Sequence, residues 1–88
     1  MASYEVIFKR SAEKDLRDLP KGTVKRVLTR IEELQGDPRP RQSSKLTGAE
    51  QLYRVRVGDY RIIYGVADDE REITVYYVRH RRDAYRQL

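Results

Sequence analysis

The segment Tyr53–Tyr64 reads YRVRVGDYRIIY and decides the fold, because two alternating apolar runs flank the pair Gly58-Asp59. A two-residue loop that begins with glycine is typical of a type II′ turn, whose twist matches the strands of a β-hairpin. Counting outward from this turn places Arg56 opposite Arg61 and Tyr53 opposite Tyr64. The sequence therefore predicts a hairpin with a defined register.

This register separates the side chains of the hairpin into two faces. The first face carries Tyr53, Val55, Val57, Tyr60, Ile62 and Tyr64, and the second carries Arg54, Arg56, Arg61 and Ile63. Like charges directly opposite each other destabilise a strand pair, so three arginines with no interleaved acid need an explanation. A solvated polar face is the ordinary one. A surface that binds phosphate is the alternative that we favour.

Two helices are predicted before the hairpin. A strand over Tyr4–Lys9 precedes a first helix that has Ser11 as its N-cap and ends near Leu19. The second helix runs from Thr23, and Gly36 fits the position just past its C-terminus. Its apolar stripe consists of Val24, Val27, Leu28, Ile31 and Leu34. Such a helical pair can cover one face of a sheet.

The rest of the chain adds one strand. Residues 37–47 form a polar loop, residues 68–72 form an acidic turn, and Ile73–Arg79 is strongly strand-forming. A short C-terminal helix is predicted from about Arg82. We therefore expect a single α+β domain over residues 1–88 with the order β-α-α-β-β-β. Its antiparallel meander would be covered on one face by an αα-hairpin.

Composition restricts the possible functions. The chain has 88 residues, a net charge of +5 and a pI of about 9.7, which favours a polyanionic partner. It has no cysteine and one histidine, His80, so we expect no metal site. No apolar run approaches the length of a membrane span, and we expect a cytoplasmic protein without a membrane partner.

The unbalanced arginines lie in residues 39–61 and 79–86. In a meander the end of the last strand lies beside the middle strand, so Arg79 to Arg82 should approach Arg61. His80 lies among cations that disfavour its protonated form, and it could act as a base near neutral pH. Tyr85 could anchor a terminal helix or stack on an RNA base. The acids form no two-metal cluster, so a nuclease built from these residues would use the RNA 2′-OH as nucleophile.

Two motifs together resemble a known family. LYRVRVGDYRIIY at Leu52–Tyr64 and VRHRRDAYR at Val78–Arg86, in this order of elements, resemble the RelE/ParE superfamily of type II toxin–antitoxin toxins. The resemblance is to its RelE branch, which implies a ribosome-dependent endoribonuclease that cuts mRNA in the A site without a metal or other cofactor.

The resemblance also implies roles for individual residues. Arg54 and Arg56 would hold phosphate, where the family pattern has lysines, and Arg61 would clamp the scissile phosphate. Arg81 would stabilise the transition state or leaving group, and Tyr85 would stack on or orient the nucleotide. Because arginine stays charged in proteins and is a poor base, His80 is the candidate for that role. Further phosphate contacts are expected from Lys45, Arg79 and Arg82.

The implied partners are the ribosome with its mRNA and rRNA, and an acidic antitoxin, RelB-like or Phd-like, bound in a hetero-oligomer. Two alternatives remain open. A ParE-type toxin has the same fold but inhibits DNA gyrase and cuts nothing. A non-catalytic relative would bind RNA without cleaving it.

Overall fold

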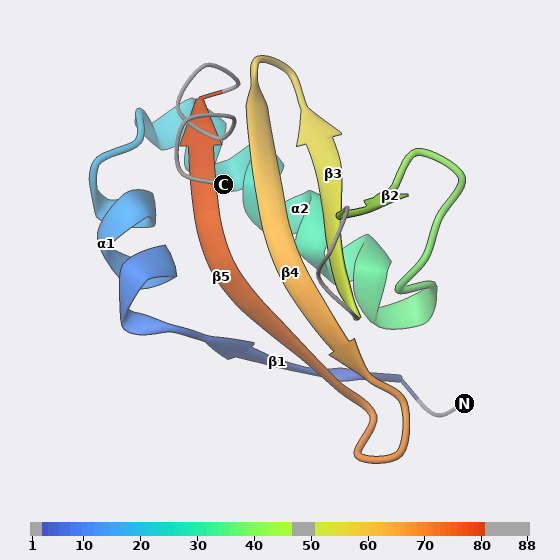
Figure 1. Ribbon diagram of the computed structural model, residues 1–88. Helices are drawn as coiled ribbons and strands as arrows, with labels where there is room; N and C mark the ends of the chain where they lie inside the picture. Colours follow the sequence, from blue (N-terminus) through green and yellow to red (C-terminus); the bar gives the residue numbers. More distant parts are fainter. Residues whose placement is uncertain (1–2, 47–50, 81–88) are drawn as a thin grey trace.

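The computed structural model describes residues 3–46 and 51–80. Its elements are β1 (Glu5–Phe8), α1 (Arg10–Arg17), α2 (Lys21–Gly36), β2 (Ser44–Lys45), β3 (Leu52–Val57), β4 (Tyr60–Ala67) and β5 (Glu72–His80). The strands form one sheet in the spatial order β1-β5-β4-β3-β2. Helix α2 lies behind the sheet in Figure 1, and α1 lies beside the outer edge of β5. The predicted α+β fold and the antiparallel β3-β4-β5 meander are confirmed. The predicted C-terminal helix lies outside the described residues.

The β3–β4 hairpin has the predicted register. Its Cα partners are Tyr53–Tyr64, Arg54–Ile63, Val55–Ile62, Arg56–Arg61 and Val57–Tyr60. Gly58, the first residue of the turn, has a φ of +58°, as a type II′ turn requires at that position. A residue other than glycine would be strained there. The turn and the alternation of the strands together determine which side chains face the helices.

The core lies between the helices and the sheet. Its buried members are Ala12, Val27, Ile31, Leu34, Val55, Val57, Ile62, Tyr64, Val66, Ile73, Val75 and Val78. The predicted stripe of α2 is confirmed for Val27, Ile31 and Leu34. It is wrong for Leu28, which is 40% exposed. Leu28 lies about 100° around the helix from Val27, so it falls beyond the edge of the contact with the sheet.

The predicted helix ends need three corrections. Helix α2 begins at Lys21 and not at Thr23, since Pro20 is its capping residue. Ser11 is not an N-cap, because α1 begins at Arg10 and Lys9 is the capping residue. The hydroxyl of Ser11 instead donates a hydrogen bond to the carbonyl oxygen of Tyr76 in β5, at 2.6 Å. Gly36 is the last residue of α2 and not the first residue beyond it.

Two features of the sheet go beyond the predicted meander. Strand β1 joins it in parallel, with Glu5 opposite Glu72 and Phe8 opposite Val75, so the sheet is mixed. Part of the predicted polar loop forms β2, which pairs with β3. In the described part of the chain, the helices are too short or too polar to cross a membrane.

Candidate functional site

Three arginines form a row across the three central strands. Arg56 of β3 lies opposite Arg61 of β4, and Arg61 lies opposite Arg79 of β5. Directly opposed residues have Cβ atoms about 5 Å apart. This arginine row lies on the face of the sheet that the helices leave uncovered, which we call the open face. The predicted approach of Arg79 to Arg61 is therefore confirmed.

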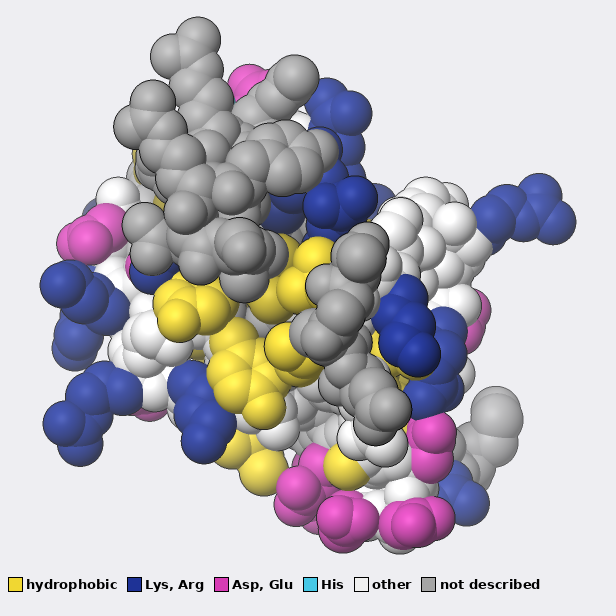
Figure 2. All heavy atoms as spheres, in the orientation of Figure 1, with side chains coloured by type: hydrophobic (Ala, Val, Ile, Leu, Met, Phe, Trp, Pro, Cys, Tyr) yellow, Lys and Arg dark blue, Asp and Glu magenta, His cyan; other side chains and the backbone are white. Residues whose placement is uncertain are grey.

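The charges on the open face are segregated along the strands. Arg54 lies on this face two residues before Arg56, opposite Ile63, and adds a fourth arginine beside the arginine row. Figure 2 shows hydrophobic side chains in the middle of the face and Lys and Arg side chains near the upper end of β3. Acidic side chains gather at the lower end, where the β4–β5 turn carries Asp68, Asp69 and Glu70. The face thus has a cationic end and an anionic end.

Helix α1 supports the strand that carries Arg79. Beyond Val75 the outer edge of β5 has no strand partner among the described residues, and polar groups around α1 take its place. Asp15 accepts hydrogen bonds from the Val78 N–H at 2.9 Å and from Arg79 Nε at 3.0 Å. Ser11 bonds the Tyr76 carbonyl from one turn earlier on the same helix. Asp15 therefore orients Arg79 and closes the strand edge at once.

We expect Asp15→Ala to lower the free energy of unfolding by about 2 kcal/mol, since it leaves a part-buried N–H and a part-buried guanidinium without their acceptor. Asp15→Asn keeps an acceptor for the Val78 N–H and loses only the charge beside Arg79, so it should cost about half as much. Urea denaturation of the purified variants measures both values.

Glu13→Ala is the matched control, because Glu13 is an exposed acid on the same helix. It should stay within about 0.5 kcal/mol of the parent chain. If Asp15→Asn were as stable as the parent chain, the ion pair with Arg79 would contribute nothing to the fold.

The remaining predicted site residues are not all on the open face. His80 lies opposite Tyr60, and its ring meets the Tyr60 ring edge-on with centroids 5.5 Å apart. Because side chains alternate along a strand, His80 follows Arg79 onto the helix-covered side. Lys45 of β2 lies opposite Tyr53, also a residue of that side. The structure therefore brings together Arg54, Arg56, Arg61 and Arg79, and places His80 and Lys45 apart from them. Arg81, Arg82 and Tyr85 lie outside the described residues.

Arg39 belongs to a different cluster, although its segment is rich in unbalanced cations. It forms an ion pair with Asp68 at 2.6 Å and donates from Nε to the Tyr53 hydroxyl at 2.9 Å. The Tyr4 hydroxyl donates to the same carboxylate at 2.7 Å. The hydrogen bonds from Arg39 and then Tyr4 hold the pKa of Asp68 below its usual value. Arg39 therefore fastens a loop to the β4–β5 turn and adds no charge to the arginine row.

The sequence alone does not reveal the part that Asp15 plays. An acid near the start of a helix is typical of a residue that complements the helix dipole, whereas Asp15 reaches across to β5. The signal that could have revealed it is the spacing of Ser11 and Asp15, four residues apart and beside the buried Ala12. Polar residues next to an apolar stripe lie at the border of a helix–sheet contact, where strand edges offer hydrogen-bonding groups.

Comparisons with known proteins agree with this geometry. The sequence matches the ParE toxin family of type II toxin–antitoxin systems, parDE, over residues 6–85. It is 37% identical over 76 residues to the RelE1 protein of Methanocaldococcus jannaschii, and the aligned region covers 83% of this chain and 84% of the relative.

Solved structures give the same result. The match in the archaeal RelE–RelB complex from Pyrococcus horikoshii has a TM-score of 0.79 and 35% identity, covering 92% of this chain and 97% of that one. The match in the RelBE2 toxin–antitoxin complex from Mycobacterium tuberculosis has a TM-score of 0.78 and 27% identity, covering 89% and 98%. With the family match spanning most of the sequence, the chain belongs to the RelE/ParE superfamily of toxins of type II toxin–antitoxin systems.

Proposed function

We propose that this toxin is a ribosome-dependent endoribonuclease that cuts mRNA in the A site without a metal ion. The observation that supports this most is the arginine row, in which three strands present like charges at directly opposed positions. Such a row weakens the sheet, and a row of guanidinium groups is suited to hold the phosphodiester of an RNA chain. The dependence on the ribosome and the cleavage in the A site are inferred from the resemblance of the toxin to the RelE branch.

The chemistry that we propose is attack of the RNA 2′-OH on the neighbouring phosphate. Charge then develops on the phosphate oxygens, and fixed guanidinium groups stabilise that charge more in the transition state than in the ground state. Arg61, in the middle of the row, would bind the scissile phosphate, with Arg54 and Arg56 on the flanking nucleotides. Arg81 and Tyr85 keep the roles that the family resemblance implies.

His80 is our candidate for the base, and the geometry sets a condition on this role. Its ring lies against Tyr60, next to the β3–β4 turn, on the other side of the sheet from Arg61. For the imidazole to accept the 2′-OH proton, the bound RNA must pass around the end of the sheet beside that turn.

We also propose a cognate antitoxin, in a hetero-oligomer, as the second partner. The matched chains from P. horikoshii and M. tuberculosis come from complexes with antitoxins. The toxin carries a net charge of +5, so an acidic antitoxin segment would complement the open face.

Induction of the toxin in cells, followed by mapping of mRNA 5′ ends, tests the proposal. We expect new 5′ ends within translated codons and few in untranslated regions. Purified toxin should cut an mRNA when ribosomes are present and leave the same RNA intact when they are absent. Cleavage of free RNA would contradict the dependence on the ribosome.

A second candidate function is inhibition of DNA gyrase. The observation that favours it is the family match itself, which is to the ParE toxin of parDE systems. In that case induction would cause double-strand DNA breaks while mRNA stays intact, and purified toxin would inhibit supercoiling by gyrase. The same induced cells therefore distinguish the two candidates.

A further inference from the structure

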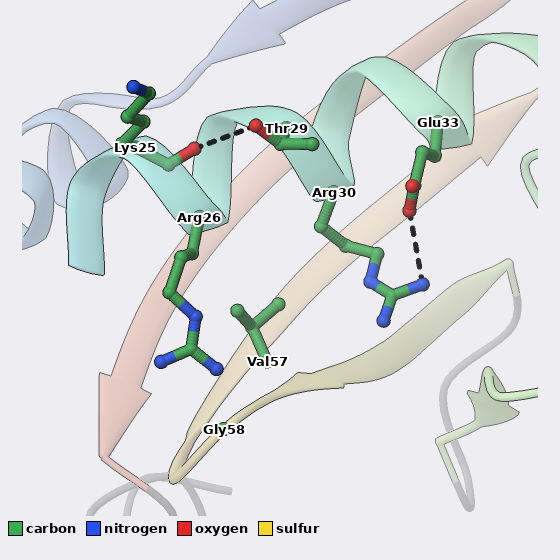
Figure 3. A pocket seen from close by; sticks show the side chains of 7 residues that line it. All are labelled: Lys25, Arg26, Thr29, Arg30, Glu33, Val57 and Gly58. Carbon is green, nitrogen blue, oxygen red and sulfur yellow. Dashed lines mark hydrogen bonds and ion pairs between the residues drawn. The ribbon is translucent and has the colours of Figure 1, made fainter. Parts of the chain in front are cut away.

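A basic groove of about 370 Å³ lies on the helix side of the molecule, between α2 and the end of β3. Figure 3 shows the side chain of Arg26 directed from α2 toward Val57 and Gly58, and that of Arg30 directed toward Glu33, whereas Lys25 points away from the strand. The lining residues are Lys25, Arg26, Thr29, Arg30, Glu33, Val57 and Gly58. Three of them are cations and one is an acid, so the groove has a net positive charge.

The charge in the groove is only partly neutralised. Arg30 forms an ion pair with Glu33 at 3.1 Å on the surface of α2. Arg26 and Lys25 are exposed, and neither forms an ion pair with a described residue. Because Lys25 points away from the strand, Arg26 is the cation that faces the groove without a counter-charge among the described residues, and it leaves the groove open to an anionic ligand.

The groove is continuous with the open face through Gly58. A Cβ atom at Gly58 would lie 3.0 Å from Nη2 of Arg26, so the guanidinium of Arg26 rests directly on this residue. From the other side of the sheet, Arg56 Nε donates to the Gly58 carbonyl oxygen at 2.9 Å. Two arginines from opposite faces thus meet at the hairpin turn. Arg56 in turn is the first member of the arginine row.

We propose that the RNA bound on the open face continues around the β3–β4 turn and that Arg26 and Arg30 bind its backbone phosphates in the groove. The proposal rests on the proposed function, since it extends the same RNA path. It gives a reason for the position of His80, because the row Val57–Tyr60–His80 lies on the groove side, next to the turn.

An RNA backbone fits this surface better than an acidic peptide does. The cations form one path from Arg79 through Arg61 and Arg56 to Arg26, and it rounds the end of the hairpin at Gly58. Acids lie beside this path: Asp59 is exposed in the turn, and Asp15 and Glu33 pair with Arg79 and Arg30. A nucleic acid backbone carries a phosphate at every nucleotide and can follow such a path, and arginine binds phosphate in bidentate geometry.

The test is the salt dependence of RNA binding, measured by fluorescence anisotropy with a labelled oligouridylate. Each phosphate contact to a single strand contributes about −0.7 to the slope of log K against log salt. The double variant Arg26→Gln/Arg30→Gln should therefore flatten the slope by about 1.4. Arg26→Lys/Arg30→Lys, which keeps both charges, should restore most of it.

Lys14→Gln/Arg17→Gln is the charge-matched control, since it removes two exposed cations of α1 away from the groove. It should leave the slope unchanged. An unchanged slope in the Arg26/Arg30 glutamine variant, with wild-type RNA binding intact, overturns this inference alone. The same variant losing affinity for the antitoxin but not for RNA assigns the groove to the antitoxin and overturns it as well. A wild-type chain that does not bind the oligouridylate overturns this inference, whereas the cleavage assay with ribosomes tests the proposed function separately.

Discussion

Arg61→Ala should lower the rate of ribosome-dependent mRNA cleavage by about 10²–10³-fold, the usual cost of removing one group that stabilises charge in a transition state. Arg61 lies between Arg56 and Arg79, so it is the guanidinium best placed to contact a phosphate from the centre of the row. Arg61→Lys should recover only part of the rate, because an ammonium group keeps the charge but cannot bind phosphate with two parallel hydrogen bonds. Cleavage of a reporter mRNA on purified ribosomes measures each rate.

Two controls separate chemistry from folding. Urea denaturation should show that Arg61→Ala remains folded, since the substitution removes like-charge contacts across both strand pairs. Arg17→Ala, which removes an exposed arginine of α1, should cleave at the parental rate. Wild-type cleavage by Arg61→Ala would exclude the arginine row from the reaction. Growth arrest with intact mRNA and broken DNA would favour the gyrase candidate.

The hairpin could be predicted from sequence because its information is local. A glycine-first two-residue turn fixes the register, and alternation then assigns every side chain to a face. The opposition of Arg56 and Arg61 follows from counting alone, and the structure has it. Predicting that Arg79 lies beside Arg61 required one further assumption, that β5 pairs with β4 in a meander. The short turn between these two strands is also a local feature.

The features that the sequence did not reveal depend on contacts between distant segments. Leu28 has the spacing of a core residue, but how far a helix stripe is buried depends on how α2 lies across the sheet. Ser11 has the chemistry of an N-cap, yet β5 passes close enough to take its hydroxyl. Neither of these can be read from a window of neighbouring residues.

The arginine row and the core make opposite contributions to one small sheet. Opposed arginines weaken strand pairing at the end where RNA would bind, so the stability of the sheet must come from elsewhere. The aromatic pair Tyr53–Tyr64, at the far end of the same hairpin, stacks with ring centroids 5.8 Å apart. The stability contributed by the Tyr53–Tyr64 end of the hairpin offsets the repulsion between the arginines at the other end, where RNA would bind.

Tyr64→Ala should therefore have the largest effect on stability, a loss of about 3–5 kcal/mol as for other large aromatic residues truncated in a core. Tyr64 is fully buried, and its hydroxyl donates to the Pro38 carbonyl oxygen at 2.7 Å. A domain of this size has a total stability of roughly 4–13 kcal/mol, so the variant should lose a large share of its stability. Tyr64→Phe removes only the hydroxyl and should cost about 1–2 kcal/mol. Urea denaturation measures both.

The pH dependence and an exposed control make this prediction specific. Burial raises the pKa of Tyr64, so the unfolded chain loses this proton at a lower pH than the folded chain does. Stability from this group is complete below about pH 10 and falls as the pH rises further; in Tyr64→Phe that part of the fall should be absent. Leu28→Ala should cost less than about 1 kcal/mol, because Leu28 is 40% exposed. If Leu28→Ala were as costly as Tyr64→Ala, α2 would pack on the sheet through the stripe that the sequence predicts, and the orientation of the helix that forms the basic groove would be different.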